Sequence, residues 1–335
     1  MSALIRLNNL PTVSGLSDEG VKKATFYFVK VFAGLRPHTQ KAYRSDFEKY
    51  SKFMAEYRPG IPAFTSDVDT MRTNIMAYVD YLLSQGFKRT TINRNLNIIS
   101  QVSNSMMIPN PYRDDRDFRT YIGNTISNGL SSAHRAQALP VTAEIMRAVC
   151  KRKPIDDLTL RNQVMANLAW DTLCRASEIG MAKWVDIDWN EGTLLIPQSK
   201  SNKTGELDYR FLSQTTLTGL SQLKAATPSG ASYLFNPLTN TNGILISGSK
   251  NGLSYTSVVQ GLRSALRFGG VARADDYTGH SFRVGAALDM KRNNLSDGLI
   301  QASGGWKDST MPSYYTRKLE TAQSGSARLA QIHNR

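Results

Sequence analysis

The sequence predicts a mainly α-helical protein with one small antiparallel β-sheet, built as two domains. Apolar residues recur at helical spacing through most of the chain, and they alternate as in strands only over a short central segment. A small, polar and basic stretch near residue 130 interrupts the helical pattern. The length of 335 residues also suits two domains of ordinary size.

The first domain is expected to be helical over residues 35–128, after a flexible N-terminal arm of residues 1–34. Three apolar stripes at helical spacing predict three amphipathic helices. The first stripe is Tyr43, Phe47, Tyr50 and Met54; the second is Val68, Met71, Ile75, Tyr78 and Leu82; the third is Ile92, Leu96, Ile99 and Met106. Gly86 is a natural end for the second helix, and Pro109 ends the third. A weaker pattern predicts a fourth helix over residues 114–128.

The second domain is expected over residues 139–335, after a linker of residues 129–138. Thr142 is the predicted N-cap of its first helix. An apolar helix follows over residues 158–173, and helices return from about residue 255 after a loop that is rich in Asn, Gly and Ser.

The strands of the predicted sheet lie between these helices. Residues 184–189 alternate in polarity, residues 190–192 form a turn, and residues 193–196 resume a strand. Residues 207–212 can supply a third strand. The period of two residues therefore predicts a small antiparallel sheet inside a helical domain.

The charge of the chain points to a polyanionic partner. Lys and Arg number 41 against 27 Asp and Glu, a formal net charge of +14. No apolar run approaches the ~18 residues of a membrane span, and the N-terminus lacks the pattern of a signal peptide. We therefore expect a cytoplasmic protein that binds nucleic acid. We expect it neither to be secreted nor to bind a membrane.

Neither a metal nor another cofactor is expected. The two cysteines, Cys150 and Cys174, are expected to be reduced thiols. The four histidines are scattered at His38, His134, His280 and His333 and form no zinc-like spacing with the cysteines.

Three short segments of the second domain combine residue types that carry chemistry. They are Asp171–Gly180, Thr278–Gly285 and Gly304–Tyr315. Each has an ordinary structural explanation when it is taken alone. Arg175 and Glu178, for example, have the spacing of an ion pair within a helix.

Together and in this order, the segments resemble the tyrosine recombinase or phage integrase family, and within it the Cre-like recombinases of phages and plasmids. The matching motifs are Thr-Gly-His-Ser-x-Arg-Val-Gly-Ala-Ala at 278–287, Gly-Gly-Trp at 304–306 with a tyrosine nine residues later, and Leu-x-Arg-x-x-Glu-Ile at 173–179. The resemblance implies a two-domain DNA clamp, in which a helical core-binding domain precedes the catalytic domain. It also implies a site-specific recombinase that breaks and rejoins DNA through a Holliday junction.

The resemblance assigns Tyr315 as the nucleophile that forms a 3′-phosphotyrosyl link. Arg175 and Arg283 would neutralise the phosphate, a role that suits a guanidinium because it stays charged and offers parallel donors to two oxygens. His280 and Trp306 would donate hydrogen bonds to the same phosphate. The adjacent Tyr314 is a less suitable nucleophile, because the family spacing from the tryptophan selects Tyr315.

Proton transfer completes the expected site. A phenol has an ordinary pKa of about 10, so it needs an acceptor, and the family assigns His280 to that role. A lysine on a β-hairpin protonates the leaving 5′-oxygen in the family, and Lys200 is the best match. Lys203 remains the alternative, or else a DNA contact. Glu178 is expected to support the arginines, because a carboxylate that faced the phosphate would repel it.

The contacts with DNA are expected on one helix of each domain. Thr90, Asn93 and Arg94 match one contact helix of the family, while Ser257 and Gln260 match another. A solvated helix face is the alternative reading of all five residues. The resemblance further implies that the protein binds double-stranded DNA with an inverted-repeat site, as a dimer on one site and a homotetramer on two duplexes.

Two other functions share these sequence features. A type IB topoisomerase or telomere resolvase would use the same nucleophile and arginine pair. A non-catalytic protein could keep the fold only to bind DNA.

The C-terminal segment 326–332 is amphipathic and too short to fold alone. In the family such a segment packs on a neighbouring protomer, and we expect the same here.

Overall fold

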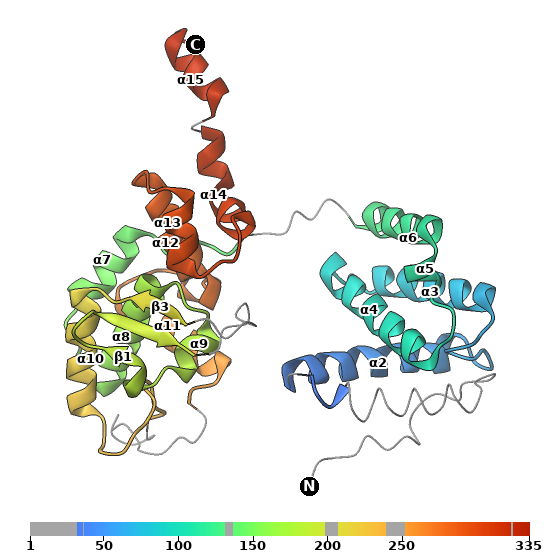
Figure 1. The fold of residues 1–335 in the computed structure, drawn as a ribbon, viewed down its shortest axis with the longest axis horizontal. Coiled ribbons are helices and arrows are strands. Elements are labelled where there is room, and N and C mark those ends of the chain that lie inside the picture. The colour runs from blue at the N-terminus through green and yellow to red at the C-terminus, as the bar shows by residue number, and fades with distance from the viewer. Residues whose placement is uncertain (1–31, 36, 131–136, 198–206, 239–251, 323) are drawn as a thin grey trace. The chain divides into compact units, whose positions relative to one another are not determined.

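The computed structural model describes residues 32–35, 37–130, 137–197, 207–238, 252–322 and 324–335. The chain forms two compact units, Met1–Arg135 and Ala136–Arg335 (Figure 1). The division falls within the expected linker 129–138, of which residues 131–136 lie outside the described part. As expected, the fold is mainly helical with one small antiparallel sheet.

The first unit contains only helices among its described residues. They are α2 (Pro37–Tyr57), α3 (Val68–Ser84), α4 (Arg89–Met106), α5 (Pro111–Asp114) and α6 (Arg116–Gly129). The side chains of Asp67 and Asp115 cap α3 and α6 by accepting N–H groups of their first turns. Gly86 follows α3 with φ of 70°, a conformation that glycine adopts without strain.

The core of the first unit is built from the predicted apolar stripes. Tyr50, Phe53 and Tyr78 pack ring against ring at its centre, and the Tyr78 centroid lies 5.0 Å from that of Tyr50 and 5.0 Å from that of Phe53. Phe32 is also buried in this core, three residues before the predicted start of the domain at residue 35.

The second unit combines helices with the small sheet (Figure 1). Its helices are α7 (Ala143–Lys151), α8 (Asp157–Thr172), α9 (Ala176–Met181), α10 (Gln214–Ala226), α11 (Tyr255–Phe268), α12 (Gly279–Arg292), α13 (Asp297–Gly304), α14 (Thr310–Ala322) and α15 (Gly325–Ile332). Thr142 caps α7 as expected, by accepting the N–H of Ile145. No helix among the described residues has the length and apolarity that crossing a membrane requires.

The sheet has three antiparallel strands in the order β1, β2, β3, with β1 at Ile187–Asp188, β2 at Thr193–Ile196 and β3 at Asp208–Phe211. The prediction of a strand over 184–189 is wrong in its first half, because Trp184–Asp186 form a 3₁₀ turn. The carboxylate of Asp186 accepts the backbone N–H of Lys183 at 3.1 Å and closes this turn. A local side-chain bond therefore overrides the alternating pattern.

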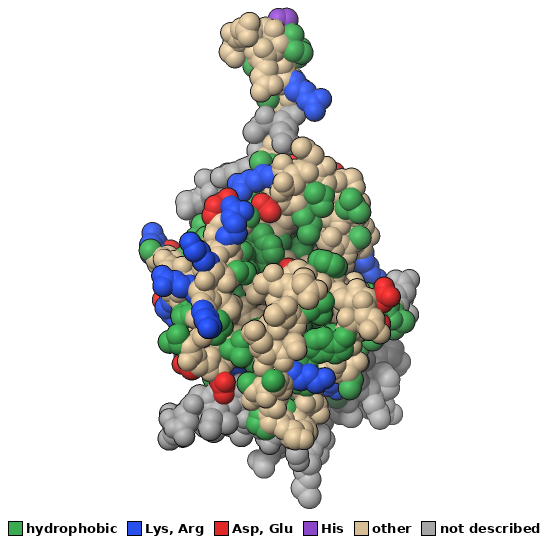
Figure 2. All heavy atoms as spheres, turned by 90° about the vertical axis from the view of Figure 1, so that its left-hand side faces the viewer, with side chains coloured by type: hydrophobic (Ala, Val, Ile, Leu, Met, Phe, Trp, Pro, Cys, Tyr) green, Lys and Arg blue, Asp and Glu red, His purple; other side chains and the backbone are tan. Residues whose placement is uncertain are grey.

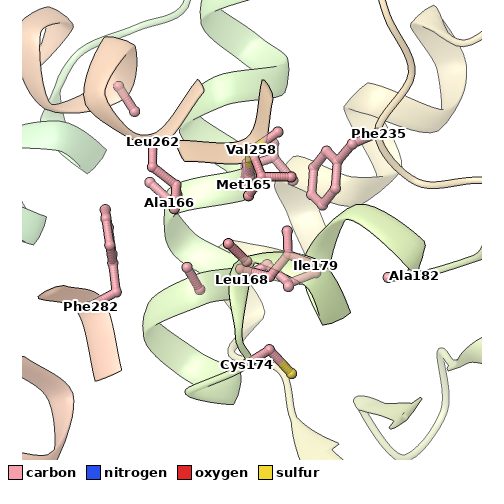
Figure 3. Packing of buried hydrophobic residues seen from close by; sticks show 14 of the residues in the cluster. Met165, Ala166, Leu168, Cys174, Ile179, Ala182, Phe235, Val258, Leu262 and Phe282 are labelled. Atoms are coloured by element: carbon pink, nitrogen blue, oxygen red, sulfur yellow. The ribbon is translucent and has the colours of Figure 1, made fainter. Parts of the chain in front are cut away.

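The core of the second unit surrounds α8 (Figure 3). Met165 and Leu168 of α8, Ile179 of α9 and Leu262 of α11 are buried together. Cys174 is fully enclosed in the same region, and burial raises the pKa of its thiol to about 11. This packing fixes the end of α8, which leads directly into the first of the three sequence motifs.

Candidate active site

Arg175 stands at a sharp turn between α8 and α9. Leu173 ends α8 in a left-handed conformation with φ of 51°, and Arg175 is the N-cap of α9. The Glu178 carboxylate accepts both the backbone N–H of Arg175 and its Nη1, each at 2.7 Å. Glu178 is buried, whereas the Arg175 side chain is 25% exposed. The carboxylate thus fixes one edge of a guanidinium that still reaches solvent.

Arg283 lies in the interior, on α12, and is 1% exposed. Its Nη1 donates to the carbonyl of Leu173, and its Nη2 donates to the carbonyl of Gly304 at 3.3 Å. Its Nε has no hydrogen-bond partner among the described residues. Burial lowers the pKa of Arg283, and the positive charge of Arg175 lowers it further. An arginine stays protonated despite such a shift, so the site holds two neighbouring positive charges.

Trp306 contacts both Arg283 and Tyr315. The Cζ of Arg283 is 4.8 Å from the centroid of the Trp306 ring. The Tyr315 ring packs edge-on against the same indole, with centroids 5.9 Å apart and planes at 65°. Tyr315 is 6% exposed, and the charge of its phenolate would oppose the lowering of the Arg283 pKa. The structure therefore brings the expected nucleophile and the buried arginine onto one tryptophan.

Tyr314 differs from Tyr315 in its surroundings. The two rings pack edge-on with centroids 5.9 Å apart. The Arg317 Cζ is 5.2 Å from the Tyr314 ring, whereas Tyr315 is the tyrosine that packs on Trp306. Gln137, which the sequence placed in the linker, donates from its side-chain amide to the carbonyl of Tyr315 at 3.0 Å. No local pattern could have indicated that contact, because 178 residues separate the partners.

His280 is exposed in the first turn of α12, one helical turn before Arg283. Thr278 caps this helix and accepts the backbone N–H of His280 at 3.2 Å. Lys200 and Lys203 lie outside the described residues, between the end of β2 at Ile196 and the start of β3 at Asp208. The described strands β2 and β3 pair antiparallel, and the choice of a catalytic lysine stays a prediction.

Most of the residues expected to contact DNA are open to solvent. Thr90, Asn93 and Arg94 are exposed on α4. Arg94 also donates through Nε and Nη2 to the buried carboxylate of Asp46, at 2.5 and 2.9 Å. On α11 the hydroxyl of Ser257 bonds that of the N-cap Ser254 at 2.8 Å. Gln260 is exposed on the same helix.

Arg210 of β3 was not among the residues expected from the sequence. It is buried beside the site and pairs with Asp208, Nη2 to Oδ2, at 2.7 Å. The available signal was its register, because Arg210 takes an inward position between the exposed Tyr209 and Phe211.

Comparison with known proteins gives the same family as the motifs. The Cre recombinase of Escherichia phage P1 is 25% identical over 352 aligned residues, which cover 99% of each protein. The Tn1549 transposon integrase in complex with circular intermediate DNA superposes with a TM-score of 0.59 at 12% identity, over 91% of this chain and 98% of that one. A lambda integrase tetramer bound to a Holliday junction gives a TM-score of 0.55 at 16% identity, over 90% and 78%.

The two structural similarities establish the fold. The family itself follows from a sequence match of a different kind, because the pattern of the phage integrase family fits residues 141–321, more than half of the chain. All three sequence motifs lie within that range. The chain therefore belongs to the phage integrase family.

Proposed function

We propose that this protein is a site-specific tyrosine recombinase that uses Tyr315 to cleave and rejoin DNA. One observation carries the proposal: the Tyr315 ring and the Arg283 guanidinium pack on the same indole, with Arg175 close enough to lower the Arg283 pKa. A nucleophile beside two fixed positive charges is the arrangement that phosphoryl transfer requires.

The arginines stabilise the charge that develops during cleavage. Attack on a phosphodiester gives a five-coordinate phosphorus whose non-bridging oxygens concentrate negative charge. Arg175 has one guanidinium edge bound to Glu178, which leaves other donors to face the phosphate. Arg283 supplies a second charge from a position fixed by two backbone carbonyls. Because these charges are already oriented, they need no reorganisation as the reaction proceeds.

The bonds and protons balance without a cofactor. The Tyr315 oxygen bonds to phosphorus while the bond from phosphorus to the 5′-oxygen breaks. His280 accepts the phenolic proton, and Lys200, or Lys203 in its place, protonates the 5′-oxygen. A 5′-hydroxyl of the partner duplex then attacks the phosphotyrosine and releases Tyr315. The covalent link conserves the energy of the broken bond, so neither ATP nor a metal is required.

Access to the site requires a change in the catalytic unit. Arg283 and Tyr315 are almost fully covered, and a phosphate cannot contact side chains that protein atoms enclose. The exposed His280 and the partly exposed Arg175 are the groups that DNA can reach first. A shift of α14, which carries Tyr315, would then open the remainder of the site.

Binding and assembly follow the charge and the C-terminal helix. Most of the Lys and Arg side chains on the face that Figure 2 shows lie along its left edge, in keeping with a partner rich in phosphates. Helix α15 buries none of its residues, and Leu329 and Ile332 are exposed on it. We propose that α15 packs on a neighbouring protomer, in a dimer on one inverted-repeat site and a tetramer on two.

A covalent-capture experiment tests the proposed function. The full chain is incubated with duplexes that carry a randomised segment, in EDTA and without ATP, and protein-linked DNA is recovered after denaturation and sequenced. We expect an inverted-repeat site and a 3′ linkage to Tyr315. Tyr315→Phe should bind the recovered duplex and form no adduct, because it loses one hydroxyl and no positive charge. An adduct formed by Tyr315→Phe, or none formed by the parent, would contradict the proposal.

The recovered duplex also separates the other functions. A recombinase exchanges strands between two such duplexes, whereas a type IB topoisomerase only relaxes a supercoiled plasmid that carries the site. A binding protein forms no covalent link. Truncation after Glu320 removes α15 and should abolish the tetramer in gel filtration with DNA; an undiminished tetramer would contradict the exchange of this helix.

A further inference from the structure

Arg210 occupies an unusual position for an arginine. Its side chain is 1% exposed, whereas Tyr209 and Phe211 on either side of it in β3 are exposed. An edge strand normally turns apolar side chains inward and charged ones outward. In β3 the charged side chain points inward instead. Burying it costs free energy unless the guanidinium has specific hydrogen-bond partners.

The partners of Arg210 lie on its own strand and on α13. Its Nη2 donates to Asp208 at 2.7 Å. Its Nη1 donates at 2.6 Å to the carbonyl of Ser303, a residue of α13 that is 93 positions away in the chain. A side chain at Gly305 would place its Cβ only 1.8 Å from Nη2. The guanidinium is therefore enclosed between its own strand and the end of α13.

The end of α13 leads directly to Trp306. A helix leaves its last four carbonyls without partners inside the helix. In α13 two of them are satisfied by the turn that follows, because Trp306 donates its N–H to Gln301 and Gly305 donates to Ala302, both at 3.1 Å. Gly305 takes a left-handed conformation with φ of 55°, which closes this turn.

The other two carbonyls accept hydrogen bonds from arginines. Ser303 accepts from Arg210 of β3, and Gly304 accepts from Arg283 of α12. Cations are favoured at the negative end of a helix dipole, so each guanidinium is stabilised where it lies. All four terminal carbonyls of α13 are thus satisfied, and two consecutive ones are held from different elements.

We propose that Arg210 is a positioning residue, which fixes the Gly304–Gly305 turn and through it Trp306 and Arg283. The inference rests on the proposed function. Arg210 touches no reacting atom. A Cβ at Gly304 would lie 1.9 Å from the Trp306 ring, so the turn and the indole are in direct contact and any shift of one moves the other. Because Trp306 carries both Arg283 and Tyr315 on its surfaces, a loosened turn disturbs the whole arrangement.

The test compares two buried arginines of the same unit. Arg210→Met removes the bonds to Ser303 and Asp208. Arg161→Met is the matched control, because Arg161 is also buried but donates to Asn162 and Asn236, away from the site. Single-turnover adduct formation is measured on the captured duplex, at a temperature where circular dichroism shows every variant folded.

We expect Arg210→Met to bind the duplex normally and to form the adduct about 100-fold more slowly, as expected for a site displaced by about 1 Å. Arg161→Met should form the adduct at the parent rate, even if its melting temperature falls as far as that of Arg210→Met. Arg210→Lys should give an intermediate rate, because one ammonium can replace part of the two-sided contact. If Arg210→Met does not fold, Arg210→Lys against Arg161→Lys gives the same comparison.

Two further arms locate the effect. Arg210→Met combined with Trp306→Phe should be no slower than the slower single variant, because both changes disturb one unit. A duplex with sulfur in place of the 5′-bridging oxygen releases a thiolate, which leaves without being protonated. Such a duplex restores the rate only of variants that have lost the proton donor. It should therefore not restore the rate of Arg210→Met, because Arg210 takes no part in protonating the leaving group.

The inference would be overturned if Arg210→Met formed the adduct at the parent rate, or if Arg161→Met lost as much rate as Arg210→Met. It would also be overturned if the effects of Arg210→Met and Trp306→Phe on the rate were additive, or if the sulfur duplex restored the rate of Arg210→Met. A parent chain that forms no adduct at all would instead contradict the proposed function. The two failures are therefore distinguishable.

Discussion

The two units each bury charged groups, but they balance them differently. In the first unit, Asp46 is 0% exposed and accepts two bonds from Arg94 and one from Asn95. The Lys49 Nζ also lies 3.9 Å from this carboxylate, so one buried negative charge lies between two cations that reach solvent. Tyr78 donates to Asn95 to complete the network. In the second unit the buried charge is mainly positive, because Arg210 and Arg283 are both buried. In the part of the chain that the structure describes, the carboxylates beside Arg175, Arg210 and Arg283 are those of Glu178 and Asp208.

The cluster of the second unit, in which the buried charge is positive, is the one that fits a ligand. A phosphodiester carries one negative charge, which would neutralise the excess beside Arg283. An excess of charge alone does not define a site, however. Burial also lowers the pKa of Arg161 to about 10, but only amide oxygens surround its guanidinium, and no nucleophile is paired with it. The candidate active site combines buried positive charge with Tyr315, whose ring packs on the same indole as Arg283.

The largest expected effect removes Arg175, the arginine of the second unit that reaches solvent. Arg175→Ala should slow single-turnover adduct formation by roughly 3 kcal/mol or more, while it leaves duplex binding nearly unchanged, because the guanidinium acts mainly on the transition state. Arg147→Ala is the matched control. Arg147 forms an ion pair with Glu144 at the same i to i+3 spacing, but both side chains are exposed. Equal rates for Arg175→Ala and the parent would remove the arginine from the mechanism.

A smaller effect is expected where the ion pair between Arg94 and Asp46 in the first unit is broken. Arg94→Met leaves the Asp46 carboxylate buried without its main donor and should lower the free energy of unfolding by about 2 kcal/mol, measured by urea titration. Asp46→Asn should destabilise the unit as well. Comparison of the two variants also tests the DNA contact, because only Arg94→Met should weaken binding if Arg94 reaches DNA. Equal affinities would assign Arg94 to the fold alone.

The smallest effect concerns pH. Backbone N–H groups at the start of α6, that of Phe118 foremost, and then the bond from Arg72, hold the pKa of Asp115 below its usual range. A lowered pKa in the folded state contributes stability above the unfolded value of about 4, and this is lost as the pH falls through the folded value. The stability of Asp115→Asn should therefore approach that of the parent on acidification. A constant difference between pH 7 and pH 3 would contradict this.

Local patterns determined most of the elements. The apolar stripes predicted α2, α3 and α4, and Thr142 and Gly86 marked helix ends, because the period of a helix and the chemistry of its caps are set by neighbours in the chain. The strand predicted at 184–186 failed for the same kind of reason, since the Asp186 carboxylate favours a 3₁₀ turn that alternation does not reveal.

The sequence alone also determined the motifs, and with them the family and the identity of Tyr315, Arg175 and Arg283 as candidates. The tertiary structure decided what these side chains contact. Arg283 meets the carbonyl of Leu173 from 110 residues away, and Arg210 meets Ser303 across 93 residues. Such partners depend on how helices and strands pack in three dimensions, and no periodicity along the chain encodes them.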